Sequence, residues 1–164
     1  MRKLFFISAI AICLLNCRQG GIEGETIVDP NLEFSGSALT KRTTINAKAR
    51  VLLKDWPEFN ELEAGFDALY QVENNEELVL SIEDLLEKQN ALAASQFPES
   101  FDIPQVRSRL KVLKTFILKM KAAAEYRIAV QEPALELISA YNALSDQFNV
   151  VVNSQLDTEL IFED

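Results

Sequence analysis

The chain has 164 residues, a formal net charge of −9 and no histidine. This length suits one domain with a substantial hydrophobic core. The acidic balance argues against a nucleic-acid partner and against electrostatic adhesion to anionic lipid headgroups, and the lack of histidine excludes Ser-His and Cys-His catalysis and histidine metal sites.

The first sixteen residues have the composition of an export signal. Arg2 and Lys3 form a positive start, and Leu4–Leu15 is an apolar run of twelve residues. Such a run is too short to span a bilayer comfortably but is typical of a secretory signal. The alternatives to a lipoprotein-type signal are a plain signal peptide, an uncleaved anchor and a hydrophobic helix of a soluble protein. Removal of residues 1–16 would leave 14 basic and 25 acidic residues, a formal charge of −11.

The end of this signal, Leu14-Leu15-Asn16-Cys17, resembles the lipobox of bacterial lipoproteins. The resemblance covers residues 1–17 alone, and Asn16 stands where the family usually has a smaller residue. It implies that residues 1–16 are removed and that Cys17 is the lipidation site, with two or three acyl chains, since a single chain binds a membrane only marginally. Because Arg18 rather than an aspartate follows the cysteine, the resemblance favours the outer membrane, on its periplasmic face or at the cell surface.

Residues 17–36 are predicted to be a flexible tether that begins at the lipidated cysteine. Four of the five glycines of the chain lie in this stretch, and Asp29-Pro30 is a turn signal. A flexible chain of this length would reach roughly 25 Å in root mean square, enough to hold a domain just off a membrane. Alternatively, Thr26–Val28 and Leu32–Phe34 would lie on the domain as short extended pieces, which their β-branched and aromatic content also suits.

Residues 37–164 are predicted to form an all-α antiparallel bundle of four to five helices. Ser37 is the expected N-cap of a first helix that reaches Trp56, and Pro57 separates it from a second helix, the two acting as one broken helix. Asn74-Asn75 offers the N-cap of a third helix that runs to about Ser95. The apolar stripes at helical spacing contain Ile45, Ala49, Leu52 and Leu53 in the first helix, Phe59, Leu62, Phe66 and Leu69 in the second, and Leu78, Ile82, Leu85, Leu86, Leu92 and Ala93 in the third.

Two more helices complete the predicted bundle. Gln89 falls on the seam of the third helix, where a rim position is expected rather than a buried one. Residues 97–104 are expected to form a loop packed on the bundle. Pro104 suits the first turn of the fourth helix, and Glu132-Pro133 marks the break into the fifth. Their stripes contain Val106, Leu110, Leu113, Phe116, Ile117, Met120, Ala124 and Ile128 in the fourth helix, and Leu137, Ile138, Tyr141, Leu144, Phe148, Val151 and Val152 in the fifth.

No residue pattern in the chain indicates catalysis, a metal site or a cofactor. No glycine-rich phosphate loop or calcium-binding loop is present, and Cys17, the one thiol left after removal of the signal, would be blocked by lipid. The acidic pairs Glu61/Glu63 and Glu76/Glu77 are interpreted as solvated helix surface, because nothing supplies the partner group that acid–base catalysis needs. We therefore expect a protein that is not an enzyme.

Charge is segregated along the predicted fourth helix. It holds seven basic residues, half of those in the mature chain, and Glu125 is its one acid. One interpretation is that the basic residues pair with acidic neighbouring helices and select the antiparallel arrangement, each exposed pair contributing about 0–1 kcal/mol. The other is that they dock an anionic partner, such as an envelope polymer or an acidic protein. The residues that can line one exposed stripe are Arg107, Lys111, Lys114 and Lys121.

Together these features predict a lipid-anchored, non-enzymatic cell-envelope protein. Its helical domain would be a binding or structural module, for example an accessory subunit of a membrane assembly. The expected partners are the membrane, through acyl chains on Cys17, and an envelope protein or an anionic envelope polymer. The alternative is a carrier that holds an apolar small ligand between its helices, although aromatic residues on such stripes are more often core than pocket. The residues that would line the carrier site are Phe66, Phe116, Tyr141 and Phe148.

Overall fold

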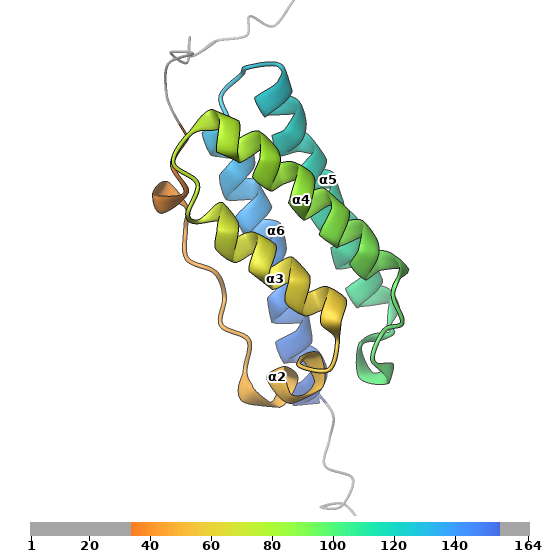
Figure 1. Cartoon of the computed structure of the whole chain (residues 1–164). Coiled ribbons are helices and arrows are strands. Elements are labelled where there is room, and N and C mark those ends of the chain that lie inside the picture. Colours follow the sequence, from red (N-terminus) through yellow and green to blue (C-terminus); the bar gives the residue numbers. More distant parts are fainter. Residues whose placement is uncertain (1–33, 155–164) are drawn as a thin grey trace, which may run out of the picture.

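The computed structural model describes residues 34–154, and over this range the chain is an all-α helical bundle, as the sequence predicted. The four longest helices run antiparallel, and each packs against the next one in the chain (Figure 1). The predicted signal, Cys17, most of the predicted tether and residues 155–164 lie outside the described range. The elements in chain order are η1 (Gly36–Ala38), α2 (Ala47–Leu53), α3 (Pro57–Leu69), α4 (Asn75–Ala94), η2 (Glu99–Phe101), α5 (Pro104–Glu125) and α6 (Gln131–Ser154).

The core is formed by the predicted stripes, with aromatic residues at one end. Phe148 on α6 lies 4.7 Å from Phe101 and 5.2 Å from Phe59 between ring centroids. Trp56 packs beside them and donates from Nε1 to the hydroxyl of Ser95 (2.8 Å). Because Phe101 belongs to η2, the connection between α4 and α5 is packed on the bundle, as expected from its sequence.

The first predicted helix begins nine residues later than expected, with its N-cap at Asn46 instead of Ser37. Ser37 lies in η1, and its side chain bonds that of Ser35 instead of capping a helix. Asn46 is the N-cap of α2, accepting from the Ala49 N–H (2.8 Å). β-Branched residues at 43–45 oppose helix formation before this cap. α2 is a short helix beside α6 at the end of the bundle (Figure 1), so α3 alone is the fourth bundle helix, and the prediction of one broken helix was wrong.

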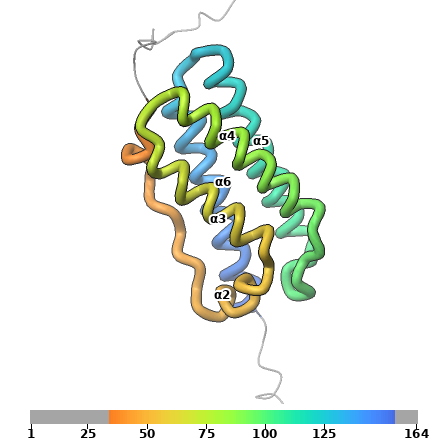
Figure 2. The backbone as a smooth tube through the Cα atoms, in the orientation of Figure 1, coloured from red at the N-terminus to blue at the C-terminus, as the bar shows by residue number. Residues whose placement is uncertain are grey.

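Residues 39–46, which we call the strap, run along the side of the bundle without helical structure (Figure 2). Two asparagines of α6 hold it. Each amide accepts from one strap N–H and donates to the carbonyl two residues earlier, as a neighbouring β-strand would. The bonds join Asn142 to Thr43 (2.7 Å) and Lys41 (3.3 Å), and Asn149 to Asn46 (2.8 Å) and Thr44 (3.0 Å).

The spacing of these two asparagines matches the strap. Three extended residues advance about 10 Å, and seven helical residues advance about 10.5 Å. The strap therefore runs parallel to α6 with both amides in register. On its other side it contacts α3, through a hydrogen bond from the Tyr70 hydroxyl to the Thr40 carbonyl and an ion pair between Arg42 and Asp67.

The described chain is already packed where it begins. Phe34 is buried, and its N–H donates to the side chain of Asn75 (3.1 Å). The Gly36 N–H donates to the Val72 carbonyl (2.8 Å), and a Cβ at Gly36 would lie 2.3 Å from the Leu69 carbonyl oxygen, which leaves no room for a side chain. Packing thus extends to Phe34, inside the range predicted as tether and at the end of one of the extended pieces given as the alternative.

Three predicted positions on α4 and α5 were wrong. Gln89 is not on the rim: it is 1% exposed, and its Nε2 donates to the Leu110 carbonyl (3.1 Å). The seam of α4 keeps a seven-residue repeat through Leu85, Gln89 and Leu92, which leaves Ala93 exposed. Ile128 is also exposed, because α5 ends at Glu125 before the stripe reaches it.

Candidate functional site

The basic face of α5 is the candidate site that the sequence singled out. α5 turns an apolar stripe to the core, so its charged residues lie outside. Within the described chain these side chains differ in what they contact, and the contacts separate those that hold the bundle together from those that face solvent. The buried stripe consists of Val106, Leu110, Leu113, Ile117, Met120 and Ala123.

Arg107 at the start of α5 is bound within the domain. Its Nε and Nη2 each lie 2.7 Å from Oδ1 of Asp102. Its guanidinium also lies over the ring of Phe97, 4.1 Å from the centroid, in cation–π geometry. Arg107 therefore fastens the connection between α4 and α5.

Two other members of the predicted stripe face α4. Lys114 donates from Nζ to the side-chain oxygen of Asn90 (2.7 Å). Lys121 lies 3.3 Å from a carboxylate oxygen of Glu83 and 3.6 Å from one of Glu125. Of these contacts, the Lys121–Glu83 pair joins opposite charges on α5 and α4, as the charge-complementarity interpretation requires. Glu125 lies on α5 itself, and the side chain of Asn90 is neutral.

Lys111 is the member of the stripe that remains for an outside partner. It is exposed, and no hydrogen bond or ion pair of its ammonium group is found among residues 34–154; the same holds for the nearby guanidinium of Arg109. The predicted stripe thus divides into three side chains that bind neighbouring residues and one that faces solvent. Docking of an anionic partner stays a prediction for Lys111.

Charge reversal at Lys121 and at Lys111 should have different effects. Lys121→Glu places a third carboxylate beside Glu83 and Glu125, so we expect the free energy of unfolding to fall by about 1 kcal/mol or less. Lys111→Glu should change it by less than about 0.5 kcal/mol. Urea unfolding of the purified domain measures both. Equal losses would contradict this division of the basic face.

The aromatic residues proposed for a carrier site pack against other side chains. The rings of Phe66 and Tyr141 lie 4.3 Å apart between centroids, and Phe148 contacts Phe59 and Phe101. Phe116 is half-buried and packs at the edge of the core. These side chains fill the space between the helices themselves.

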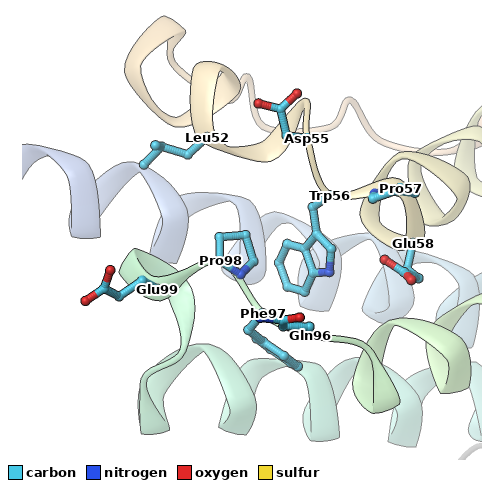
Figure 3. Close-up of a pocket in the computed structure, with 9 residues that line it drawn as sticks. All are labelled: Leu52, Asp55, Trp56, Pro57, Glu58, Gln96, Phe97, Pro98 and Glu99. Carbon is cyan, nitrogen blue, oxygen red and sulfur yellow. The ribbon is translucent and has the colours of Figure 1, made fainter.

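An open cleft lies elsewhere, where the α2–α3 corner meets the η2 connection (Figure 3). Its volume is about 460 Å³. Trp56 and Phe97 form part of its floor and pack against each other at 4.8 Å, while the carboxylates of Asp55, Glu58 and Glu99 stand around it. The cleft is therefore shallow and polar at its edge. It is lined by Leu52, Asp55, Trp56, Pro57, Glu58, Gln96, Phe97, Pro98 and Glu99.

A polar network that the sequence did not indicate joins α2, α3 and α6. The Tyr141 hydroxyl donates to Oε1 of Glu63 (3.0 Å), and Oε2 of Glu63 pairs with Arg50. Burial, together with the charge of Glu63, raises the pKa of Tyr141 well above its ordinary value, so the hydroxyl remains a donor. Of the predicted solvated pair, Glu61 is exposed, but Glu63 is half-buried and bound, which corrects the sequence interpretation for Glu63.

Residues 34–154 contain neither a cluster of metal-ligating side chains nor a helix that could span a membrane. In this range no group of three or more cysteine, aspartate or glutamate residues is placed to hold a metal ion. None of the described helices is long and apolar enough to cross a membrane. Comparison of the chain with protein-family models, with curated proteins and with solved structures found no match.

Proposed function

We propose that this chain is a lipid-anchored, non-enzymatic protein of the bacterial cell envelope, whose helical bundle is a binding or structural module such as an accessory subunit of a membrane assembly. The observation that carries the proposal is the sequence Leu14-Leu15-Asn16-Cys17 after a positive start and an apolar run. In this proposal Cys17 accepts the lipid, and the outer membrane is the favoured location. Lys111 is the exposed cation of the basic face that would meet an anionic partner.

Features of the bundle support a structural or binding role. Three contacts of polar side chains join its elements: Tyr141 to Glu63, Glu63 to Arg50, and Gln89 Nε2 to the backbone of α5. The hydroxyls of Ser81 and Ser145 and Oε1 of Gln89 are buried without a hydrogen-bond partner among residues 34–154. The three contacts fix the arrangement of the helices. The surface that remains for a partner is therefore a rigid one, presented on fixed helices.

Replacement of Cys17 by serine should release the protein from membranes. The hydroxyl cannot take the thioether-linked lipid, so we expect the full-length chain to move from the membrane fraction to the soluble fraction, and its N-terminal peptide to lack acyl chains. Cys13→Ser is the matched control, since Cys13 lies in the apolar run that is removed. The lipid anchor would be contradicted if Cys17→Ser stayed in the membrane fraction and the N-terminus of the wild-type protein carried no acyl chains.

The partner is sought by affinity purification of the native protein from detergent-solubilised membranes, followed by mass spectrometry. We expect envelope proteins to be recovered with the wild type and to be reduced with Lys111→Glu. Lys121→Glu serves as the control, because Lys121 already pairs within the bundle. Equal recovery of envelope proteins with the two variants would mean that Lys111 does not contribute to the proposed interface.

A further inference from the structure

The corner between α5 and α6 exposes two large side chains. Tyr126 is 78% exposed and Ile128 is 62% exposed. The Ile128 N–H donates to the Ala123 carbonyl (3.0 Å), the Arg127 N–H donates to the Ala124 carbonyl (3.2 Å), and Arg127 has a φ of 53°. These are the hydrogen bonds and the left-handed residue of a Schellman turn. The turn ends α5 at Glu125, so Ile128 lies outside the helix and its side chain is exposed instead of buried in the core.

The three side chains at this corner are of kinds that are found at membrane–water interfaces. Arginine stands at the left-handed position, where glycine is the usual residue because a Cβ is disfavoured there. Tyrosine gives an amphipathic ring, isoleucine an aliphatic group and arginine a long apolar stem with a cationic end. Side chains of these kinds sit at the level of lipid headgroups, with the apolar part inward and the polar part in water.

The corner lies at the end of the bundle where the described chain begins (Figure 1). Lys121 on α5 pairs with Glu83 on α4, and the two helices are antiparallel. From that pair, Asn75 is eight residues back along α4, about 12 Å, and Tyr126 is five residues on along α5, about 7.5 Å in the same direction. The N–H of Phe34 donates to Asn75. The chain that leads from Cys17 therefore enters the domain at this end.

We infer that Tyr126, Arg127 and Ile128 contact the interfacial layer of the membrane, so that the anchored domain rests on lipid with this end. The inference depends on the lipidation of Cys17 proposed above. Sixteen residues separate Cys17 from Phe34, and as a flexible chain they would reach about 22 Å. Anchor and corner can therefore reach the same surface.

Because the proposed anchor holds the domain near the membrane, even a weak contact between the corner and the lipid would be enough to keep the corner there. Two apolar side chains hold a free domain on a bilayer only weakly, because the loss of translational and rotational freedom opposes binding. The flexible tether predicted from the sequence would supply a local concentration on the order of millimolar. The corner is therefore in the lipid when Cys17 is acylated and in water when it is not.

Acidic residues at this end specify the kind of lipid. Glu76 and Glu77 lie in the first turn of α4, and Glu132 lies in the first turn of α6. They outnumber Arg127, so anionic headgroups are repelled. The contact is therefore with zwitterionic lipid, and it weakens as the anionic fraction rises.

The test uses the full-length lipidated protein in phosphatidylcholine vesicles that carry brominated acyl chains, which quench tryptophan fluorescence on contact. Tyr126→Trp places the reporter at the corner, and Val150→Trp places it at an exposed position near the C-terminal end of α6. Trp56 is buried and gives a constant background. We expect the signal added by Tyr126→Trp to fall about twofold in brominated vesicles, and that added by Val150→Trp to stay unchanged.

Each outcome separates the contact from the anchor. Flotation with the vesicles reports the anchor alone. A chain that floats with Tyr126→Trp unquenched, or quenched no more than Val150→Trp, overturns the membrane contact and leaves the anchor intact. If the protein does not float with the vesicles, the lipid anchoring in the proposed function is contradicted. Added Ile128→Ser should restore most of the fluorescence, and a third of phosphatidylglycerol in the vesicles should weaken the quenching; quenching that anionic lipid strengthens would overturn the zwitterionic contact.

Discussion

Replacement of Phe148 by alanine is expected to lower the free energy of unfolding by about 3–5 kcal/mol. Phe148 is fully buried, and its ring meets those of Phe59 and Phe101 and the edge of Trp56. It therefore joins α6 to α3 and to the η2 connection. The loss combines the transfer free energy of the ring, the aromatic contacts and the cavity that remains.

Urea unfolding followed by far-UV circular dichroism measures this effect. Domains of this size have a total stability of about 5–15 kcal/mol, so the variant is expected to unfold at a clearly lower urea concentration than the wild type. Val150→Ala is the matched control on the same helix: Val150 is 57% exposed, and its loss should change stability by less than about 0.5 kcal/mol. A change below about 1 kcal/mol for Phe148→Ala would mean that the aromatic cluster is not the centre of the core.

Removal of both strap amides, in Asn142→Ala with Asn149→Ala, is expected to free the strap while the bundle stays folded. Four backbone groups lose their partners in the partly buried strap. The net cost is about 2–4 kcal/mol, reduced by a few tenths for each alanine because alanine favours the helix. This cost falls on the strap, because α3, α4, α5 and α6 keep their own contacts.

Hydrogen exchange of single amides gives the measurement. The N–H groups of Thr43 and Asn46 should exchange about 10–100 times faster in the double variant, while core amides of α4 and α5 change little. Asn90→Ala is the matched control, since Asn90 is also a helix-surface asparagine but accepts from Lys114 rather than from the strap. Unchanged exchange at Thr43 and Asn46 would show that other contacts hold the strap.

The bundle helices could be predicted because their information is local. α5 follows its stripe of apolar residues, and Pro104 occupies its first turn. The buried seam of α4 could also be predicted from its apolar residues. Gln89 lies on this seam, and it was predicted at the rim because glutamine is polar. A glutamine can be buried when one carbonyl is within reach, here that of Leu110, and that carbonyl cannot be located from the sequence of α4.

The strap could not be predicted because its partners are about one hundred residues away. Asn142 and Asn149 lie beside an apolar stripe and look like ordinary surface positions until a backbone segment is laid against them. One local signal was available: Asn46 follows three β-branched residues, which oppose helix formation, and asparagine is as good an N-cap as serine. The corner after α5 gave no signal either, because an arginine occupies the left-handed position that glycine usually marks.

Most of the basic face was located by sequence, but its roles were not. Periodicity places Arg107, Lys114 and Lys121 outside the core. Which of them meets a carboxylate depends on the rotation of α4 against α5, a property of the packed bundle. For this reason Lys111 could be separated from its neighbours only once the helices were in place.

The strap also determines how the domain would respond to mechanical force. A pull on the chain ahead of Phe34 acts first on the hydrogen bonds of Phe34 to Asn75 and of Gly36 to the Val72 carbonyl, and then on the strap. Its attachments would break one after another, Asn142 before Asn149, as in an opening zipper. Release of residues 34–46 would lengthen the connection by about 40 Å while α3, α4, α5 and α6 remain packed. In the lipid-anchored protein proposed above, this extension would let the module follow a partner that moves away from the membrane, and the strap would refold when the load is removed.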